Sequence, residues 1–325
     1  MSKDLFDALR DRGFITDEKC DAIHRWYDHP KVNLYLELRS LLYLGVILFT
    51  GGLSLFIYTH IEQLGHLTII SVLIALYLGC LVWSAKVAKP FSWQKVESPN
   101  TAYDYVLLLA ALLVPIIIAY LQSQFNFFGN RWSLASFIPM LILFGMAYFF
   151  DHQGVLSLAI SSLAAWLGIT IKPSLLLDFD LFNHHELIIT CFALGVALLA
   201  FATFIKTTRF KPHFNDTYQQ FGTHLAFLGA LAALVEFTQT WALWLLVIFA
   251  LGAWHLYQAF HRKNSYLMMV AILYMYIGTC YVVSGKILAH LDGENEIYAN
   301  LFYYLFSGIG VGMLINRLHK KFKTL

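Results

Sequence analysis

Long apolar runs, each about 20 residues in length and separated by short polar segments, make up most of the chain. A helix needs roughly 20 predominantly apolar residues to cross the hydrocarbon core of a bilayer. The runs predict ten membrane-spanning helices, at residues 40–59, 66–85, 103–122, 132–150, 153–171, 186–205, 219–237, 240–260, 265–284 and 298–316. We therefore predict an all-α polytopic membrane bundle over residues 39–317, with a polar extension at residues 1–38 and a basic tail at residues 318–325.

The extension, residues 1–38, has the pattern of two short helices. The first helix places Phe6 and Leu9 on one face, and Thr16 can cap the second helix, which carries Trp26. Two helices of this length bury too little apolar surface to fold alone. We expect them to dock on the bundle or on a cytoplasmic protein partner, with Phe6, Leu9 and Trp26 in contact.

The shortest predicted connection lies between the fourth and fifth spans, at residues 149–154. Asp151, His152 and Gly154 supply residue types that favour a turn. The alternative is one continuous helix over residues 132–171, which would move every later connection to the other side of the membrane.

The basic residues are distributed very unevenly between the two sides. With ten spans and both termini inside, 19 of the 22 Lys and Arg residues lie inside, and Arg131, Lys172 and Lys286 lie outside. Short loops with such a bias set the orientation of a membrane protein. The nine-span alternative gives 12 inside and 10 outside, so the charges favour ten spans and cytoplasmic termini.

Composition agrees with this class of protein. The chain is 59% hydrophobic and 13% charged, whereas soluble proteins average roughly 25% charged residues. Membrane anchoring explains the basic loops, so we predict no nucleic-acid partner. The four cysteines show no CxxC spacing, and we read them as free thiols.

Ionisable residues inside a membrane are costly, and they are candidate functional sites for that reason. His224 and His255 lie near the inner ends of two consecutive antiparallel spans, where the rings can face each other. The alternative is that each histidine simply bonds a backbone carbonyl near the headgroups. Glu186 and Glu236 lie at the outer ends of their spans, where they are either solvated or, if buried, proton-coupling groups.

Proline and glycine positions complete the candidate set. Pro115 and Pro139 can kink their spans and free backbone carbonyls, which line cavities in some carriers. Small residues permit close approach of membrane helices, and the glycines predicted to do so are Gly45, Gly51, Gly52, Gly308, Gly310 and Gly312.

The outward segments are rich in histidine and carboxylate residues. They contain His60, Glu62, His66, His184, His185, Glu186, His290 and Asp292. These residue types suit a divalent transition metal, but no HExxH or comparable spacing is present. We predict solvated loops and neither a metal nor a cofactor. The sequence also has no phosphate-binding glycine loop or GxSxG motif, which argues against an enzyme.

The start of the chain resembles a known family. The similar residues are Leu9, Gly-Phe-Ile-Thr at 13–16, Asp-Ala-Ile at 21–23, and Arg-Ser-Leu-Leu-Tyr-Leu-Gly at 39–45. This pattern resembles the DUF2157 family of predicted bacterial membrane proteins, whose function is not established. The resemblance covers roughly the first 60 residues. It implies a short helical pair before a series of spans in the bacterial cytoplasmic (inner) membrane, and it implies no catalytic residue.

Two functional classes remain open from the sequence. One is a transporter of a small solute or ion, for which the residues to test are Pro115, Pro139, His224, His255 and Glu236. The other is a non-catalytic membrane scaffold or sensor that binds a cytoplasmic partner through residues 1–38.

Overall fold

The computed structural model of the protein describes residues 10, 14, 16–19, 35–171, 185–208, 210–291 and 293–324. These residues contain ten α-helices and short helical turns, which confirms the predicted all-α class. The helices are α3 (Tyr35–Leu64), α4 (His66–Val87), α5 (Thr101–Phe125), α6 (Trp132–Phe150), α7 (Gln153–Ile171), α8 (His185–Thr208), α9 (Asn215–Glu236), α10 (Trp241–Arg262), α11 (Ser265–Val282) and α12 (Glu294–Thr324). Each predicted span coincides with one of these helices.

Eight helices are long and apolar enough to cross a membrane, namely α4 to α8, α10, α11 with its extension to His290, and α12. The apolar part of α3, Ser40–Phe56, is shorter. Helix α9 does not meet the same criterion over the residues that the structure describes. The chain is therefore a multi-pass membrane protein with at least these eight candidate spans.

The chain divides into two compact units, residues 1–56 and residues 57–325. In the first unit α3 carries Thr50, whose hydroxyl donates to the carbonyls of Val46 and Ile47 within the helix. The predicted contact residues Phe6, Leu9 and Trp26 lie outside the described residues, as does the rest of the predicted helical pair apart from a helical segment at residues 17–19. Docking of the extension stays a prediction.

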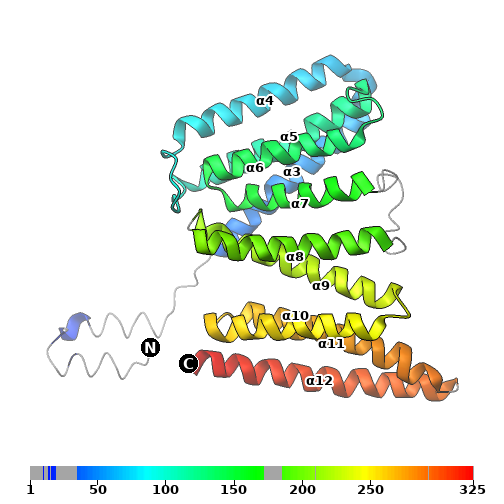
Figure 1. The fold of residues 1–325 in the computed structure, drawn as a ribbon. Coiled ribbons are helices and arrows are strands. Elements are labelled where there is room, and N and C mark those ends of the chain that lie inside the picture. The colour runs from blue at the N-terminus through cyan, green and yellow to red at the C-terminus, as the bar shows by residue number, and fades with distance from the viewer. Residues whose placement is uncertain are drawn as a thin grey trace. The chain divides into compact units, whose positions relative to one another are not determined.

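In the second unit each helix packs mainly on a helix that neighbours it in sequence, and Figure 1 shows α8 beside α9 and α10 beside α11. The α8–α9 pair has the most extensive interface. The two helices can approach closely because glycines lie at their interface. A Cβ at Gly195 would overlap the backbone of Ala226, and one at Gly229 would overlap the backbone of Phe192.

The predicted packing glycines lie elsewhere. A Cβ at Gly310 or Gly312 in α12 would meet open space, and one at Gly308 would make an ordinary contact of 3.6 Å with the Tyr276 hydroxyl. A Cβ at any of Gly45, Gly51 and Gly52 in α3 also has nothing within 4 Å. Close helix approach therefore occurs at α8–α9, at glycines that were not predicted from the sequence.

The doubtful turn between the fourth and fifth spans is present. Helix α6 ends at Phe150, Asp151 adopts the left-handed conformation with φ 57°, and α7 begins at Gln153. The N–H of His152 donates to the carbonyl of Ala147 and closes the helix end. The continuous-helix alternative is wrong.

Contacts between connections define the two ends of the second unit. The connections α4–α5, α6–α7 and α8–α9 meet at Asp151, and we call this end the Asp151 end. The other end, the opposite end, brings His66 of α4 to Tyr120 of α5 and His185 of α8 to Glu236 of α9. Neighbouring helices are thus antiparallel.

Basic residues gather at the Asp151 end. Those in the α4–α5, α8–α9 and α10–α11 connections and at the adjoining helix ends include Lys86, Lys89, Lys95, Lys206, Lys211, Arg262 and Lys263. The last turns of α12 pack on the start of α11, which places Arg317 and Lys320 at this end as well. Helix α12 continues to Thr324, so most of the predicted basic tail is an extension of the helix. At the opposite end the described basic residues are Arg131 and Lys286.

Candidate functional site

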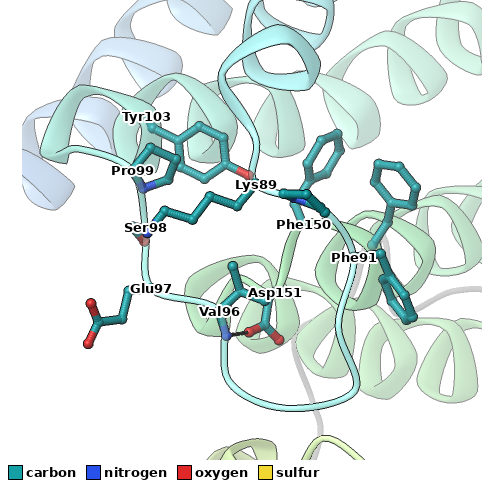
Figure 2. A pocket seen from close by; sticks show the side chains of 11 residues that line it. Lys89, Phe91, Val96, Glu97, Ser98, Pro99, Tyr103, Phe150 and Asp151 are labelled. Carbon is teal, nitrogen blue, oxygen red and sulfur yellow. Dashed lines mark hydrogen bonds between the residues drawn. The ribbon is translucent and has the colours of Figure 1, made fainter.

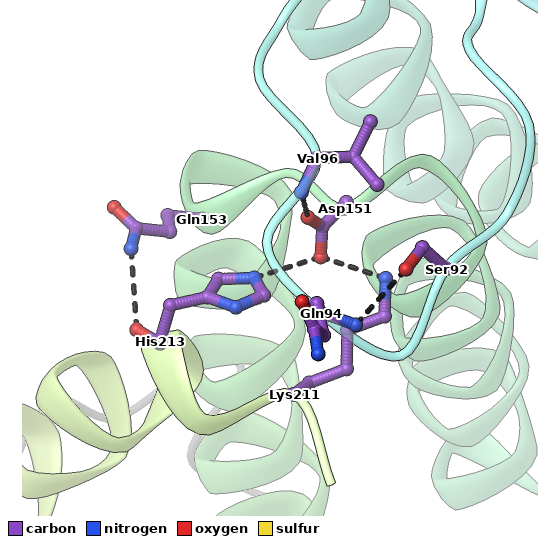
Figure 3. A network of polar contacts seen from close by, with 7 residues as sticks. All are labelled: Ser92, Gln94, Val96, Asp151, Gln153, Lys211 and His213. Atoms are coloured by element: carbon purple, nitrogen blue, oxygen red, sulfur yellow. Dashed lines mark hydrogen bonds and ion pairs between the residues drawn. The ribbon is translucent and has the colours of Figure 1, made fainter. Parts of the chain in front are cut away.

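The first polar assembly is centred on the carboxylate of Asp151, in the turn between α6 and α7. The backbone N–H of Val96 donates to its Oδ2 at 2.6 Å. Its Oδ1 accepts from Nζ of Lys211 at 2.7 Å and from Nε2 of His213 at 2.8 Å. We call Asp151, Lys211 and His213 the Asp151 cluster (Figure 3). It ties together three connections that are far apart in sequence.

Lys211 is fully buried, with 0% of its side chain exposed, while Asp151 is 3% exposed. Lys211 adopts a left-handed conformation with φ 49°, and its N–H donates to the carbonyl of Trp93. Its ammonium lies 4.8 Å from the centre of the Phe91 ring. A buried charge needs a partner and hydrogen bonds, and here Asp151 and the Phe91 ring face supply them.

His213 lies in a helical turn, Pro212–Phe214, between α8 and α9. Because a carboxylate only accepts hydrogen bonds, Nε2 of His213 carries the proton that faces Asp151. Its Nδ1 is buried and has no hydrogen-bond partner among the described residues. Burial lowers the pKa of His213, nearby Lys211 and Lys95 lower it further, and Asp151 only partly opposes this.

A second buried pair lies close in sequence to the first. Nδ1 of His152 accepts from the N–H of Val155 at 3.1 Å, so its Nε2 carries the proton and faces Oδ1 of Asp104 at 3.6 Å. Both side chains are almost fully buried. The sequence predicts only a turn residue at His152 and does not single out Asp104.

The pocket beside the Asp151 cluster is small. It is lined by side chains of the α4–α5 connection and of the α6–α7 turn, among them Lys89, Phe91, Phe150 and Asp151 (Figure 2). Its volume is about 10 Å³, which is space for roughly one water molecule. The Asp151 cluster therefore has a structural role in holding the connections together, and the pocket beside it is too small to bind a solute.

The second polar assembly runs between α9 and α10. Starting at the Asp151 end, Arg262 donates to the Gln219 side-chain oxygen at 2.7 Å, and the Gln219 amide donates to Gln258 at 2.8 Å. One turn deeper, the hydroxyl of Thr223 lies 2.8 Å from Nε2 of His255. We call Gln219, Thr223, His255, Gln258 and Arg262 the polar column.

His255 is fully buried, and both of its ring nitrogens are engaged. Nδ1 lies 2.8 Å from the carbonyl of Leu251, so it must donate. The Thr223 hydroxyl also lies 2.6 Å from the carbonyl of Gln219. This hydroxyl has one proton, so it can donate either to Nε2 of a neutral His255 or to Gln219 when a charged His255 donates to Thr223.

His224 points to α11 rather than to His255. Its Nδ1 lies 2.9 Å from the Tyr274 hydroxyl, and its Nε2 lies 2.7 Å from the Tyr266 hydroxyl. The two predicted histidines therefore belong to different contacts. The reason is geometric, because adjacent residues on a helix point about 100° apart and Thr223 already occupies the face toward α10.

Residues 7–156 match the family model described as predicted membrane protein (DUF2157). This confirms the resemblance seen at the start of the chain and extends it through α6 into α7. No curated protein and no solved structure matches the chain.

The DUF2157 match divides the candidate residues. Asp104, Asp151 and His152 lie inside residues 7–156, whereas Lys211, His213 and the whole polar column lie beyond them. The match describes a membrane protein and assigns no role to any of these residues.

The remaining sequence candidates are found at helix ends and inside helices. Glu236 accepts a hydrogen bond from Nε2 of His185 at 3.1 Å at the opposite end. Glu186 is exposed in the first turn of α8. Pro115 and Pro139 lie within continuous helices, α5 and α6. Among the described residues no group of three or more His, Cys, Asp and Glu is placed to hold a metal ion.

Proposed function

We propose that the protein is a small-solute or ion transporter of the bacterial cytoplasmic (inner) membrane, with ten spans and both termini in the cytoplasm. The gathering of basic residues at the Asp151 end supports this orientation, because cytoplasmic loops of membrane proteins carry the excess of Lys and Arg. The ion carried along the polar column is a proton, and no covalent step is involved.

The observation that supports transport is the burial of His255 between α9 and α10 with both ring nitrogens engaged. Ionisable groups that face the interior of a membrane bundle mark ion pathways and proton relays. A rotation of the Thr223 hydroxyl accommodates either charge state of the ring, so a proton can arrive and leave without loss of the helix contact.

The polar column gives His255 a route to one side only. His255 lies seven residues before Arg262 on α10, which is about 10 Å along the helix axis. Beyond it the apolar side chains of Phe227, Leu234 and Ile248 are fully buried together. A transport cycle must open this apolar closure, as when packed helices rock against each other.

Proton flux in vesicles tests the proposal. The full-length protein is reconstituted with pyranine inside, and a potassium gradient with valinomycin drives proton entry. We expect wild-type flux above that of protein-free vesicles and a fall to the protein-free level for His255→Ala. His261→Ala is the matched control, because His261 is an exposed histidine on the same helix.

Two results would reject the proposal in different ways. A wild-type flux equal to that of protein-free vesicles would show that the protein does not transport protons. Flux of His255→Ala equal to that of wild type would leave transport in place but exclude the polar column as its route.

A further inference from the structure

An apolar cavity of about 280 Å³ lies between α7, α8 and α9. Its wall includes Ala164 and Leu167 of α7, Leu187 and Cys191 of α8, and Ala232 of α9. The volume is near the lower end of the range for small-molecule pockets, roughly 300–1,000 Å³. Helices α7 and α8, which form two sides of its wall, are candidate membrane spans, and the lining is almost entirely apolar, so an apolar occupant fits the cavity.

The cavity opens toward the opposite end. Thr190 lines both the cavity and a second, more open groove formed by His185, Glu186, Phe237 and Trp244. The cavity reaches Leu194, nine residues beyond His185 on α8, which is about 14 Å along the helix. This depth is close to one leaflet of a hydrocarbon core that is about 30 Å thick.

The mouth of the cavity carries acidic groups. Glu186 lines the groove, and Glu236 lies 3.1 Å from His185 beside it. Within the described residues neither lining includes a Lys or Arg. Carboxylates complement an amine and disfavour an anionic group. The ring of Trp244, 6.0 Å from that of Phe237, is of the amphipathic type found at headgroup level.

We infer that the protein binds a membrane lipid here, with one hydrocarbon chain in the cavity and an amine-bearing headgroup at Glu186 and Glu236. The chain of such a lipid is the apolar molecule present at this depth in a bilayer. The site is separate from the polar column, and its occupancy does not depend on transport.

Native mass spectrometry of the full-length protein tests this inference. The detergent-solubilised protein is mixed with dioleoylphosphatidylethanolamine or with dioleoylphosphatidylglycerol, and the collision energy is raised until loosely held lipid is lost. We expect wild type to retain one phosphatidylethanolamine per chain and at least fivefold less phosphatidylglycerol. Ala164→Leu with Ala232→Leu fills the cavity and should lower phosphatidylethanolamine retention at least fivefold.

Two further variants keep the test independent of folding. Leu246→Phe enlarges a side chain on α10 that is 67% exposed and does not line the cavity, and it should retain lipid like wild type. Glu186→Gln with Glu236→Gln leaves the cavity open and should abolish the preference for phosphatidylethanolamine.

The inference is overturned if the cavity-filling variant retains as much lipid as wild type. Equal retention of the two lipids by wild type would overturn the assignment of the headgroup. A retained mass equal to a second copy of the chain, lost in the cavity-filling variant, would replace the lipid by a protein partner.

Discussion

Replacing Lys211 by methionine should destabilise the fold, because it removes one partner of a buried ion pair. Methionine matches the length of the lysine stem and can adopt the same backbone conformation. The Asp151 carboxylate would stay 3% exposed and would keep only His213 and the N–H of Val96 as hydrogen-bond donors. Its negative charge would then lack the buried cation that lies 2.7 Å away in wild type.

The size of the effect follows from this geometry. Breaking a buried pair by removing one partner costs about 3–5 kcal/mol. The two remaining donors to Asp151 favour the lower end of this range. We expect a loss of about 3 kcal/mol in the free energy of unfolding, which is on the order of 100-fold in the folding equilibrium.

A double variant separates charge from packing. Asn tolerates the left-handed conformation of residue 151, and its side-chain oxygen can still accept from Val96. Asp151→Asn with Lys211→Met therefore leaves no buried charge. Replacing both members of a buried pair by neutral groups is often neutral or stabilising, so we expect this variant to lie within about 1 kcal/mol of wild type.

Unfolding in mixed dodecylmaltoside and SDS micelles, followed by tryptophan fluorescence, measures these free energies. Lys95→Met is the control, because Lys95 is exposed in the same set of connections. A Lys211→Met variant as stable as Lys95→Met would refute the reasoning, since the buried pair would then contribute nothing to the fold.

Three further predictions follow from the described contacts. Gly229→Leu should abolish folded protein, because a Cβ there overlaps the backbone of Phe192, whereas Gly310→Leu in open space should fold normally, as gel filtration would show. Burial lowers the pKa of His213, so the folded state binds this proton more weakly than the unfolded state, and stability is full above about pH 6.5 and falls as the pH drops below it. Unfolding midpoints between pH 5 and 8 should show a smaller fall for His213→Gln, and an unchanged fall would exclude this role of the histidine. Phe227→Ala shortens the apolar closure next to His255 and should raise proton flux in the pyranine assay, whereas unchanged flux would argue against a closure at Phe227.

Helix positions could be predicted because they depend on local properties of the chain. A run of about 20 apolar residues crosses a hydrocarbon core only as a helix, and each predicted run coincides with a helix. The turn at Asp151 was also predictable, since it uses residue types that tolerate a left-handed conformation. The distribution of Lys and Arg residues between the connections then favoured ten helices over nine.

Contacts between distant segments were not predictable in the same way. Lys211 has the sequence pattern of an ordinary basic loop residue, yet it is fully buried against Asp151. Its burial depends on the α4–α5, α6–α7 and α8–α9 connections meeting at one point, which no local pattern encodes. The only signal in the sequence was that all three connections were assigned to the same side of the membrane.

Helix α9 is less apolar than the eight candidate membrane spans, and its position in the fold accounts for the difference. It falls below the criterion for a candidate span, yet 12 of its 22 residues are buried, including Gln219 and Thr223. In contrast, none of the apolar window of α12 is buried. A helix that faces lipid must be apolar on its exposed surface, whereas a helix enclosed by α7, α8, α10 and α11 can carry polar residues that bond its neighbours. The low apolar content of α9 is thus compatible with its enclosed position among the other helices.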